Sequence, residues 1–239
     1  MKRRWIFTLA AVFAFAACAG ETEETEDAEP AASAAEETAP AMEADPDIAP
    51  EGEATALPAG YAVRLDQPSA STDDYRVTAE DGGLHVRTGP AGILYEEATA
   101  VESGDYSVSA TFTEVGAPPN HREAFGLFIG GSDLEGEAQR YTYFLVRADG
   151  RYLIKKRDGG EMSDVSDGWV DSEAVNGAAE GGDVTNTLAI EVRGDQAHFS
   201  VNGTEVATHP VAELDAYGIA GVRINHNLDV RVEGFQLSN

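Results

Sequence analysis

Apolar and polar residues alternate with a period of two along most of residues 60–239, which is the pattern of half-buried β-strands. In one such run Tyr106, Val108, Ala110 and Phe112 alternate with serine and threonine. The same alternation recurs in three later segments, 188–193, 197–201 and 229–233. Because the 3.6-residue repeat of amphipathic helices is nearly absent, the pattern predicts an all-β domain.

Turn residues separate these runs at short intervals. Asp149-Gly150, Gly194-Asp195 and Asn202-Gly203 each stand between two alternating segments, and such pairs favour two-residue hairpins. Gly234 shifts the phase of the last run, which predicts a β-bulge. We therefore expect an antiparallel two-sheet jelly-roll sandwich of about 12 strands rather than a small barrel.

The segment 141–147 has apolar residues on both faces of its predicted strand. One face presents Tyr141, Tyr143, Leu145 and Arg147, and the other presents Thr142, Phe144 and Val146. Such a strand is either covered on both sides or lines a groove, and the alternation is compatible with both.

The first 17 residues have the layout of an export signal. Three basic residues at positions 2–4 precede an apolar run over 5–17, which is shorter than the about 20 residues that a membrane-spanning helix needs. The run ends Phe15-Ala16-Ala17-Cys18, which resembles the lipobox of bacterial lipoproteins. The resemblance implies that 1–17 is a signal peptide and that Cys18 is lipidated. It places the protein in the cell envelope, anchored to a membrane, and Ala19 after the cysteine implies the outer membrane. The alternative is an ordinary secretory signal with an incidental cysteine.

Residues 19–59 differ in composition from the rest of the chain. They contain 13 Asp and Glu but no Lys or Arg, together with many Ala, Thr and Pro. Such a segment buries too little apolar surface to fold. We expect Cys18 and a disordered acidic linker over 18–59, and a folded domain over 60–239.

The charge of the chain limits its partners. Its 43 acidic and 16 basic residues amount to a formal net charge of −27. Binding to the nucleic-acid backbone or to anionic lipid needs clustered Lys and Arg, so neither is expected.

Two segments carry a further resemblance. Residues 188–206 read LAIEVRGDQAHFSVNGTEV, and residues 218–235 run from GIAGVRI to VRVEGF. These strings resemble the concanavalin A-like lectin/glucanase superfamily, with laminin-G-like or 3-keto-disaccharide-hydrolase-like domains as the nearest types. The resemblance covers about residues 61–239 and implies the sandwich fold. It leaves the function open, since this fold has many functions.

A sugar site on this fold uses an exposed sheet face with aromatic and planar polar side chains. The candidate ligand-binding residues are Tyr141, Tyr143, Arg147, Trp169 and Arg223. Packing in the core is the alternative role for the two tyrosines and the tryptophan. No cofactor is required by any motif.

Calcium is a better candidate metal than zinc, because carboxylates crowd one turn-rich stretch and laminin-G-like relatives often bind calcium between loops. The alternative is that the carboxylates cluster by chance in a strongly acidic domain. The candidate ligands are Asp164, Asp167, Asp171 and Glu173.

The carboxylate pattern favours a non-catalytic role. Glucanases of the superfamily carry Glu-x-Asp-x-Glu on one strand, whereas the nearest string here, 133–137, reads DLEGE in a glycine-flanked loop. The favoured function is thus a lipid-anchored module that binds a glycan or another envelope component. A hydrolase of a sugar or keto-sugar glycoside and a purely structural envelope lipoprotein remain alternatives, and catalysis stays undecided.

Overall fold

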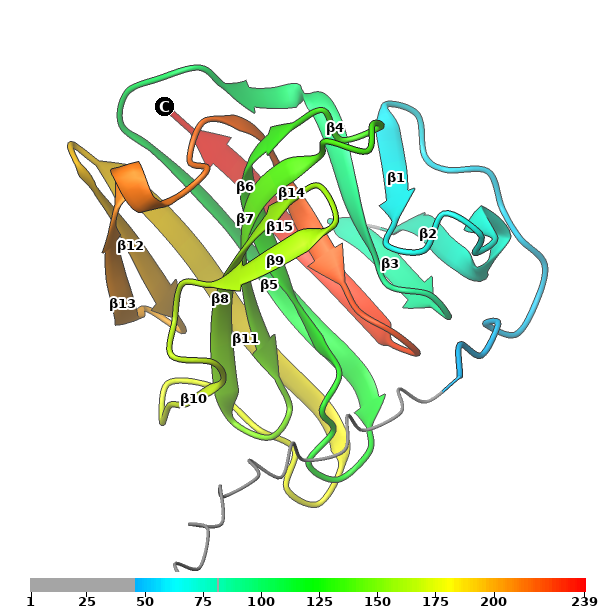
Figure 1. Ribbon diagram of the computed structural model, residues 1–239. Helices are drawn as coiled ribbons and strands as arrows, with labels where there is room; N and C mark the ends of the chain where they lie inside the picture. Colours follow the sequence, from blue (N-terminus) through cyan, green and yellow to red (C-terminus); the bar gives the residue numbers. More distant parts are fainter. Residues whose placement is uncertain (1–45, 81) are drawn as a thin grey trace, which may run out of the picture. The chain divides into compact units, whose positions relative to one another are not determined.

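The computed structural model describes residues 46–80 and 82–239, which form two antiparallel β-sheets packed face to face (Figure 1). The predicted all-β sandwich is therefore confirmed. The predicted signal peptide, the lipidation site Cys18 and most of the predicted linker lie outside the described residues.

Sheet A has eight strands in the order β1-β4-β14-β6-β7-β8-β10, and β9 also pairs with β8. The strands are β1 (Tyr61–Leu65), β4 (Gly92–Val101), β6 (Ala124–Ser132), β7 (Arg140–Arg147), β8 (Arg151–Asp158), β9 (Glu161–Asp164), β10 (Val170–Asp171) and β14 (Gly218–Ile224).

Sheet B has seven strands in the order β13-β12-β11-β5-β15-β3-β2. The strands are β2 (Tyr75–Glu80), β3 (Gly83–Thr88), β5 (Tyr106–Ala117), β11 (Gly182–Arg193), β12 (Gln196–Val201), β13 (Thr204–Pro210) and β15 (Asp229–Ser238). Two short 3₁₀ helices, η1 (Thr72–Asp74) and η2 (Val211–Glu213), lie in connections. Among the described residues no helix has the length and apolar character to cross a bilayer.

The structure contains three strands beyond the expected set of about 12. These are β9, β10 and β13. The first two are only four and two residues long and carry no clear alternation, so pairing with β8 decides their conformation.

The predicted turns are confirmed and set the register of the strands. Gly150 has φ +85° between β7 and β8, and Asn202 and Gly203 have φ +51° and +79° between β12 and β13. Positive φ at both central residues is the requirement of a type I′ hairpin. The predicted bulge at Gly234 is also present, because the register of β15 against β5 shifts between Glu233 and Gln236.

The main core lies between the two sheets. It collects the inward-pointing residues of both, and aromatic rings join them. Phe112 of β5 meets Phe125 of β6 at 5.6 Å between ring centroids, and Phe144 of β7 meets Phe199 of β12 at 5.4 Å. This burial of apolar surface is the main stabilising contribution to the fold.

Sheet A carries a second apolar cluster on the face turned away from sheet B. Its members are Ile93, Tyr95, Ala124, Phe128, Leu134, Tyr141, Tyr143, Leu145 and Leu153. Strand β7 is therefore buried on both faces, which decides between the two interpretations of its sequence. The DLEGE string lies between β6 and β7, in the connection where a loop was expected.

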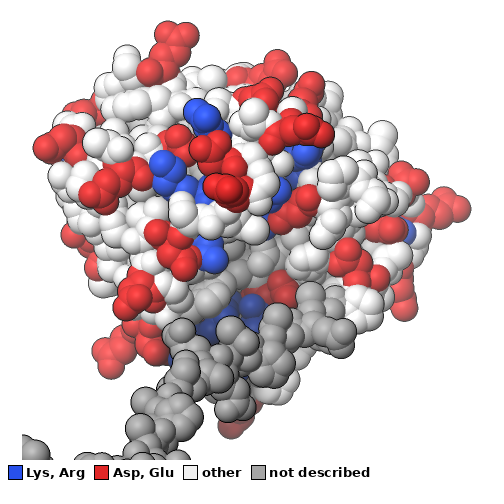
Figure 2. All heavy atoms as spheres, viewed as in Figure 1, with Lys and Arg blue, Asp and Glu red and all other residues white. Residues whose placement is uncertain are grey.

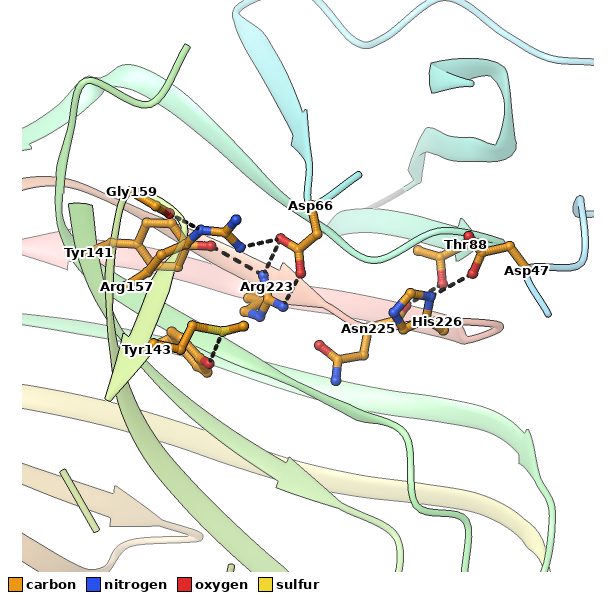
Figure 3. Close-up of polar contacts among 11 residues, drawn as sticks. Asp47, Asp66, Thr88, Tyr141, Tyr143, Arg157, Gly159, Arg223, Asn225 and His226 are labelled. Carbon is orange, nitrogen blue, oxygen red and sulfur yellow. Dashed lines mark hydrogen bonds and ion pairs between the residues drawn. The ribbon is translucent and has the colours of Figure 1, made fainter. Parts of the chain in front are cut away.

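Residues 46–60 contain no helix or strand, but the first of them contact the domain. The backbone N–H of Ile48 donates to Asn227 Oδ1 at 2.7 Å, and Asp47 pairs with His226 at 2.6 Å (Figure 3). These contacts place residues 47 and 48 beside the β14–β15 connection.

Phe144→Ala tests the main core. We expect it to lower the free energy of unfolding by about 3–5 kcal/mol, because it leaves a cavity between Phe199 and Tyr152. Chemical denaturation followed by tryptophan fluorescence measures the loss. The exposed Thr78→Ala on β2 is the control and should change the value by under about 0.5 kcal/mol. Equal effects of the two substitutions would contradict the assignment of Phe144 to the core.

Candidate functional site

The outer face of sheet A gathers arginine and tyrosine side chains around one aspartate (Figure 3). The register of β7 and β8 places Tyr141 opposite Arg157 and Tyr143 opposite Lys155. Residues directly opposite in antiparallel strands point to the same face. Arg223 belongs to β14, which β6 separates from β7, and its side chain reaches across β6 to Tyr141.

Asp66 stands immediately after β1 and receives the guanidinium groups of two arginines. Arg223 donates from Nη1 to Oδ1 at 3.0 Å and from Nη2 to Oδ2 at 2.5 Å. Arg157 donates from Nη1 to Oδ1 at 3.1 Å, and its Nε donates to the carbonyl oxygen of Gly159 at 3.0 Å. The contact with Arg223 is a bidentate pair, the strong form of an arginine–carboxylate bond.

Aromatic rings form the floor beneath these charges. The Arg223 guanidinium lies 5.0 Å from the centroid of the Tyr143 ring, and its Nη1 donates to Tyr141 Oη at 3.2 Å. Tyr141 packs against Tyr143 and Phe128 with ring centroids 5.8 and 5.3 Å away. We refer to Asp66, Tyr141, Tyr143, Arg157 and Arg223 together as the Arg223 cluster.

The electrostatics of the cluster hold its groups in one charge state. Burial alone would raise the pKa of Asp66, but the charges and hydrogen bonds of Arg223, with Arg157, outweigh it and hold that pKa below its usual value. Burial would lower the pKa of Arg223, but Tyr141 and Asp66 outweigh it, so the pKa is raised. Burial raises the pKa of Tyr143 to about 12. At neutral pH the cluster therefore holds a carboxylate, guanidinium ions and an un-ionised Tyr143.

A second polar–aromatic contact lies farther along β7. The Arg147 guanidinium stacks 4.2 Å from the ring centroid of Trp169, while its Nε donates to Asp149 Oδ1 at 2.6 Å. Arg147 is six residues from Tyr141, which corresponds to about 20 Å along a strand. Trp169 is half-buried and packs against the outer apolar cluster.

The side chains at the base of the Arg223 cluster are buried, and those at its rim are partly exposed. Tyr141 is fully buried, and only 6% of the Arg223 side chain is exposed. The exposed fraction rises to 10% for Arg157 and 21% for Asp66. Met162 of β9 is 54% exposed, and its sulfur accepts a hydrogen bond from Tyr143 Oη at 3.3 Å. A ligand would therefore meet the rim of Asp66, Arg157 and Met162 first.

The structure brings the candidate sugar-binding residues to one face of sheet A in two groups. Tyr141, Tyr143 and Arg223 belong to the Arg223 cluster, and Arg147 stacks on Trp169. Their role as ligand-binding residues stays a prediction, because their burial also suits packing.

Sequence analysis missed Asp66 and Arg157. Arg157 could have been found, since the Asp149-Gly150 turn sets the register that puts it opposite Tyr141. Nothing in the sequence signals Asp66, because its partners Arg157 and Arg223 are 91 and 157 residues away.

The candidate calcium ligands do not converge. Asp164 at the end of β9 pairs with Lys155 at 3.1 Å, and Asp171 at the end of β10 pairs with Arg151 at 2.7 Å. Asp167 and Glu173 are exposed residues of connections. Within the described residues no three acidic, histidine or cysteine side chains are placed to hold a metal ion. Calcium binding there stays a prediction.

Asp66→Asn tests the ion pairs of the cluster. We expect it to lower the free energy of unfolding by about 3 kcal/mol at pH 7, because two buried guanidinium groups lose their counter-charge. The folded-state pKa of Asp66 is depressed, so its contribution is complete above the unfolded value of about 3.9 and is lost as the pH falls through the folded value.

The gap between wild type and Asp66→Asn should thus narrow below about pH 4, as measured by urea denaturation across pH. Asp158→Asn, which removes the exposed pair with Arg140, is the control and should leave stability close to wild type. A gap that stays constant down to low pH would contradict the ionised pair.

Comparisons with known proteins agree on the fold. No family model matches the chain, and no curated protein matches it. The carbohydrate-binding module CBM66 from Bacillus subtilis superposes with a TM-score of 0.54 at 11% identity, covering 75% of this chain and 96% of the module. The carbohydrate recognition domain of Emp46p, in its potassium-bound form, gives 0.52 at 10% identity and covers 75% and 88%. The chain thus has the β-sandwich fold of these carbohydrate-binding proteins, consistent with its resemblance to concanavalin A-like domains.

Proposed function

We propose that the domain is a non-catalytic carbohydrate-binding module that an N-terminal lipid on Cys18 holds at the cell envelope, on the outer membrane. The observation that carries the binding function is the outer face of sheet A, where arginine guanidinium groups lie over tyrosine and tryptophan rings. Aromatic rings stack on the apolar faces of sugars, and arginine donates several hydrogen bonds from one plane. The likeness of the fold to two carbohydrate-binding domains supports the proposal.

The state of Asp66 supports binding rather than hydrolysis. Glycoside hydrolysis uses two carboxyl groups, and the one that acts as acid has a raised pKa. Asp66, the carboxylate of the Arg223 cluster, is bonded to Arg157 and Arg223, and its pKa is lowered rather than raised. It is therefore a poor proton donor at neutral pH.

The glycan site is tested by Trp169→Ala. We expect the purified full chain to bind members of a glycan array, and the variant to bind the same glycans roughly tenfold more weakly in titration calorimetry, a loss of about 1.4 kcal/mol. The substitution removes the ring that Arg147 stacks on, at a half-buried position of the outer face.

The matched control is Tyr217→Ala, an exposed aromatic residue that contacts Tyr106 and lies outside the outer apolar cluster. It should bind as wild type does. If the full chain binds no glycan, the purely structural alternative is favoured and the proposed binding function is wrong.

The lipid anchor is tested by Cys18→Ser. Since the diacylglyceryl group is joined to the cysteine sulfur by a thioether bond, we expect the variant to leave the membrane fraction and to lose metabolic labelling with palmitate. Immunoblots of separated membrane and soluble fractions give the readout. Membrane association that persists in the variant would rule out Cys18 as the anchor.

A further inference from the structure

Basic residues are unevenly distributed over the domain. Residues 60–239 contain 13 Lys and Arg against 30 Asp and Glu. Eight of the 13 lie on strands of sheet A, namely Arg64, Arg140, Arg147, Arg151, Lys155, Lys156, Arg157 and Arg223. In the view of Figure 2, basic side chains group in the middle of one face, with acidic side chains around and between them. Sheet A thus concentrates positive charge in a strongly acidic protein.

The Arg223 cluster contains more positive than negative charge. Two guanidinium groups, those of Arg157 and Arg223, share the single carboxylate of Asp66. Both arginines are buried, with 10% and 6% of their side chains exposed. A buried charge without a counter-charge is destabilising, so a further anion beside this pair would be stabilised.

Some hydrogen-bond donors in and around the cluster have no acceptor in the part of the chain that the structure describes. The Nε of Arg223 is buried without a partner among the described residues, as is the Nε of Arg64 on β1, which β4 separates from β14. Figure 3 draws interactions from Nε and Nη1 of Arg157, while its other terminal nitrogen points away from Asp66 with none. Arg157 therefore has one terminal nitrogen that bonds to neither Asp66 nor Gly159, and we call the N–H groups of this nitrogen the free edge of Arg157.

The contact between Asp66 and Arg223 indicates which chemical group suits these arginines. The Asp66 carboxylate is planar, and its two oxygens match the two terminal nitrogens of Arg223. A second planar carboxylate on the free edge of Arg157 would balance the two guanidinium charges. Lys155, the cross-strand partner of Tyr143, is 30% exposed and adds another basic side chain to this face, where it pairs with Asp164 at 3.1 Å.

We propose that the outer face of sheet A binds a saccharide that carries carboxylate groups, with one carboxylate on the free edge of Arg157 beside Asp66. This rests on the proposed glycan-binding function and names its ligand class as uronic-acid-containing chains. Such a chain offers an apolar sugar face for the aromatic rings and a planar anion for the arginine.

The experiment compares acidic sugars with their neutral counterparts. Oligosaccharides of galacturonate, glucuronate and mannuronate, and the methyl ester of each, are titrated into the full chain by calorimetry in 0.15 M salt. The ester keeps the sugar ring but removes the charge. We expect at least one acid form to bind roughly tenfold or more tightly than its ester.

Two variants locate the charge that recognises the acid. Arg157→Gln should bring the affinity for the acid form down to that of the ester for the same variant. Arg140→Gln, on the same sheet but 55% exposed and paired with Asp158, should keep the preference. Circular dichroism checks that each variant folds. If Arg157→Gln does not fold, Lys155→Gln takes its place and should reduce the preference several-fold.

Each remaining outcome overturns the inference in a distinguishable way. Equal binding of acid and ester, or binding of neutral glycans alone, contradicts the carboxylate preference and leaves the proposed function standing. If Arg140→Gln lost the preference for the acid form to the same extent, general surface charge would explain the preference. Stronger binding of dextran sulfate than of any uronate would lead to the same conclusion. If no glycan binds, both the inference and the proposed function are wrong.

Discussion

The bidentate contact between Arg223 and Asp66 organises the outer face of sheet A. It joins β14 to the segment that follows β1, and Arg157 extends it to β8. Because both arginines are buried, their charges need this carboxylate, and removing it would leave them uncompensated. The tyrosine rings below then have fixed positions, since Arg223 lies over Tyr143 and donates to Tyr141.

This arrangement requires a sheet that is buried on both sides. The inward face of sheet A contributes to the main core against sheet B, and its outward face carries a separate apolar cluster. A sandwich stabilised by the first core does not need the second one for its layers to pack. The outer cluster is thus the part of the domain that distinguishes sheet A from an ordinary solvent-facing sheet, and binding functions are often located on such a face.

The net negative charge of the protein affects how it could recognise an anionic ligand. A protein with a net charge of −27 repels anions at long range, so an anionic ligand would be recognised by local contacts. Screening at physiological salt confines the surrounding acidic field to about 8 Å. Within that distance two buried guanidinium groups, those of Arg157 and Arg223, face the single carboxylate of Asp66.

The sequence alone determined the sandwich and its principal turns, because these depend on local alternation and on turn residues such as Asn202-Gly203. It left open whether β7 is covered on both faces or lines a groove, and the outer apolar cluster of the structure decided that it is covered. The sequence also named Tyr141, Tyr143 and Arg223 among five candidate ligand-binding residues, on the basis of residue type. Only the tertiary structure decided that Asp66 joins them, and that Asp164 and Asp171 form ion pairs with Lys155 and Arg151. The physical reason is that pairing across the sheet brings together residues as far apart as 66 and 223, and no local pattern encodes that contact.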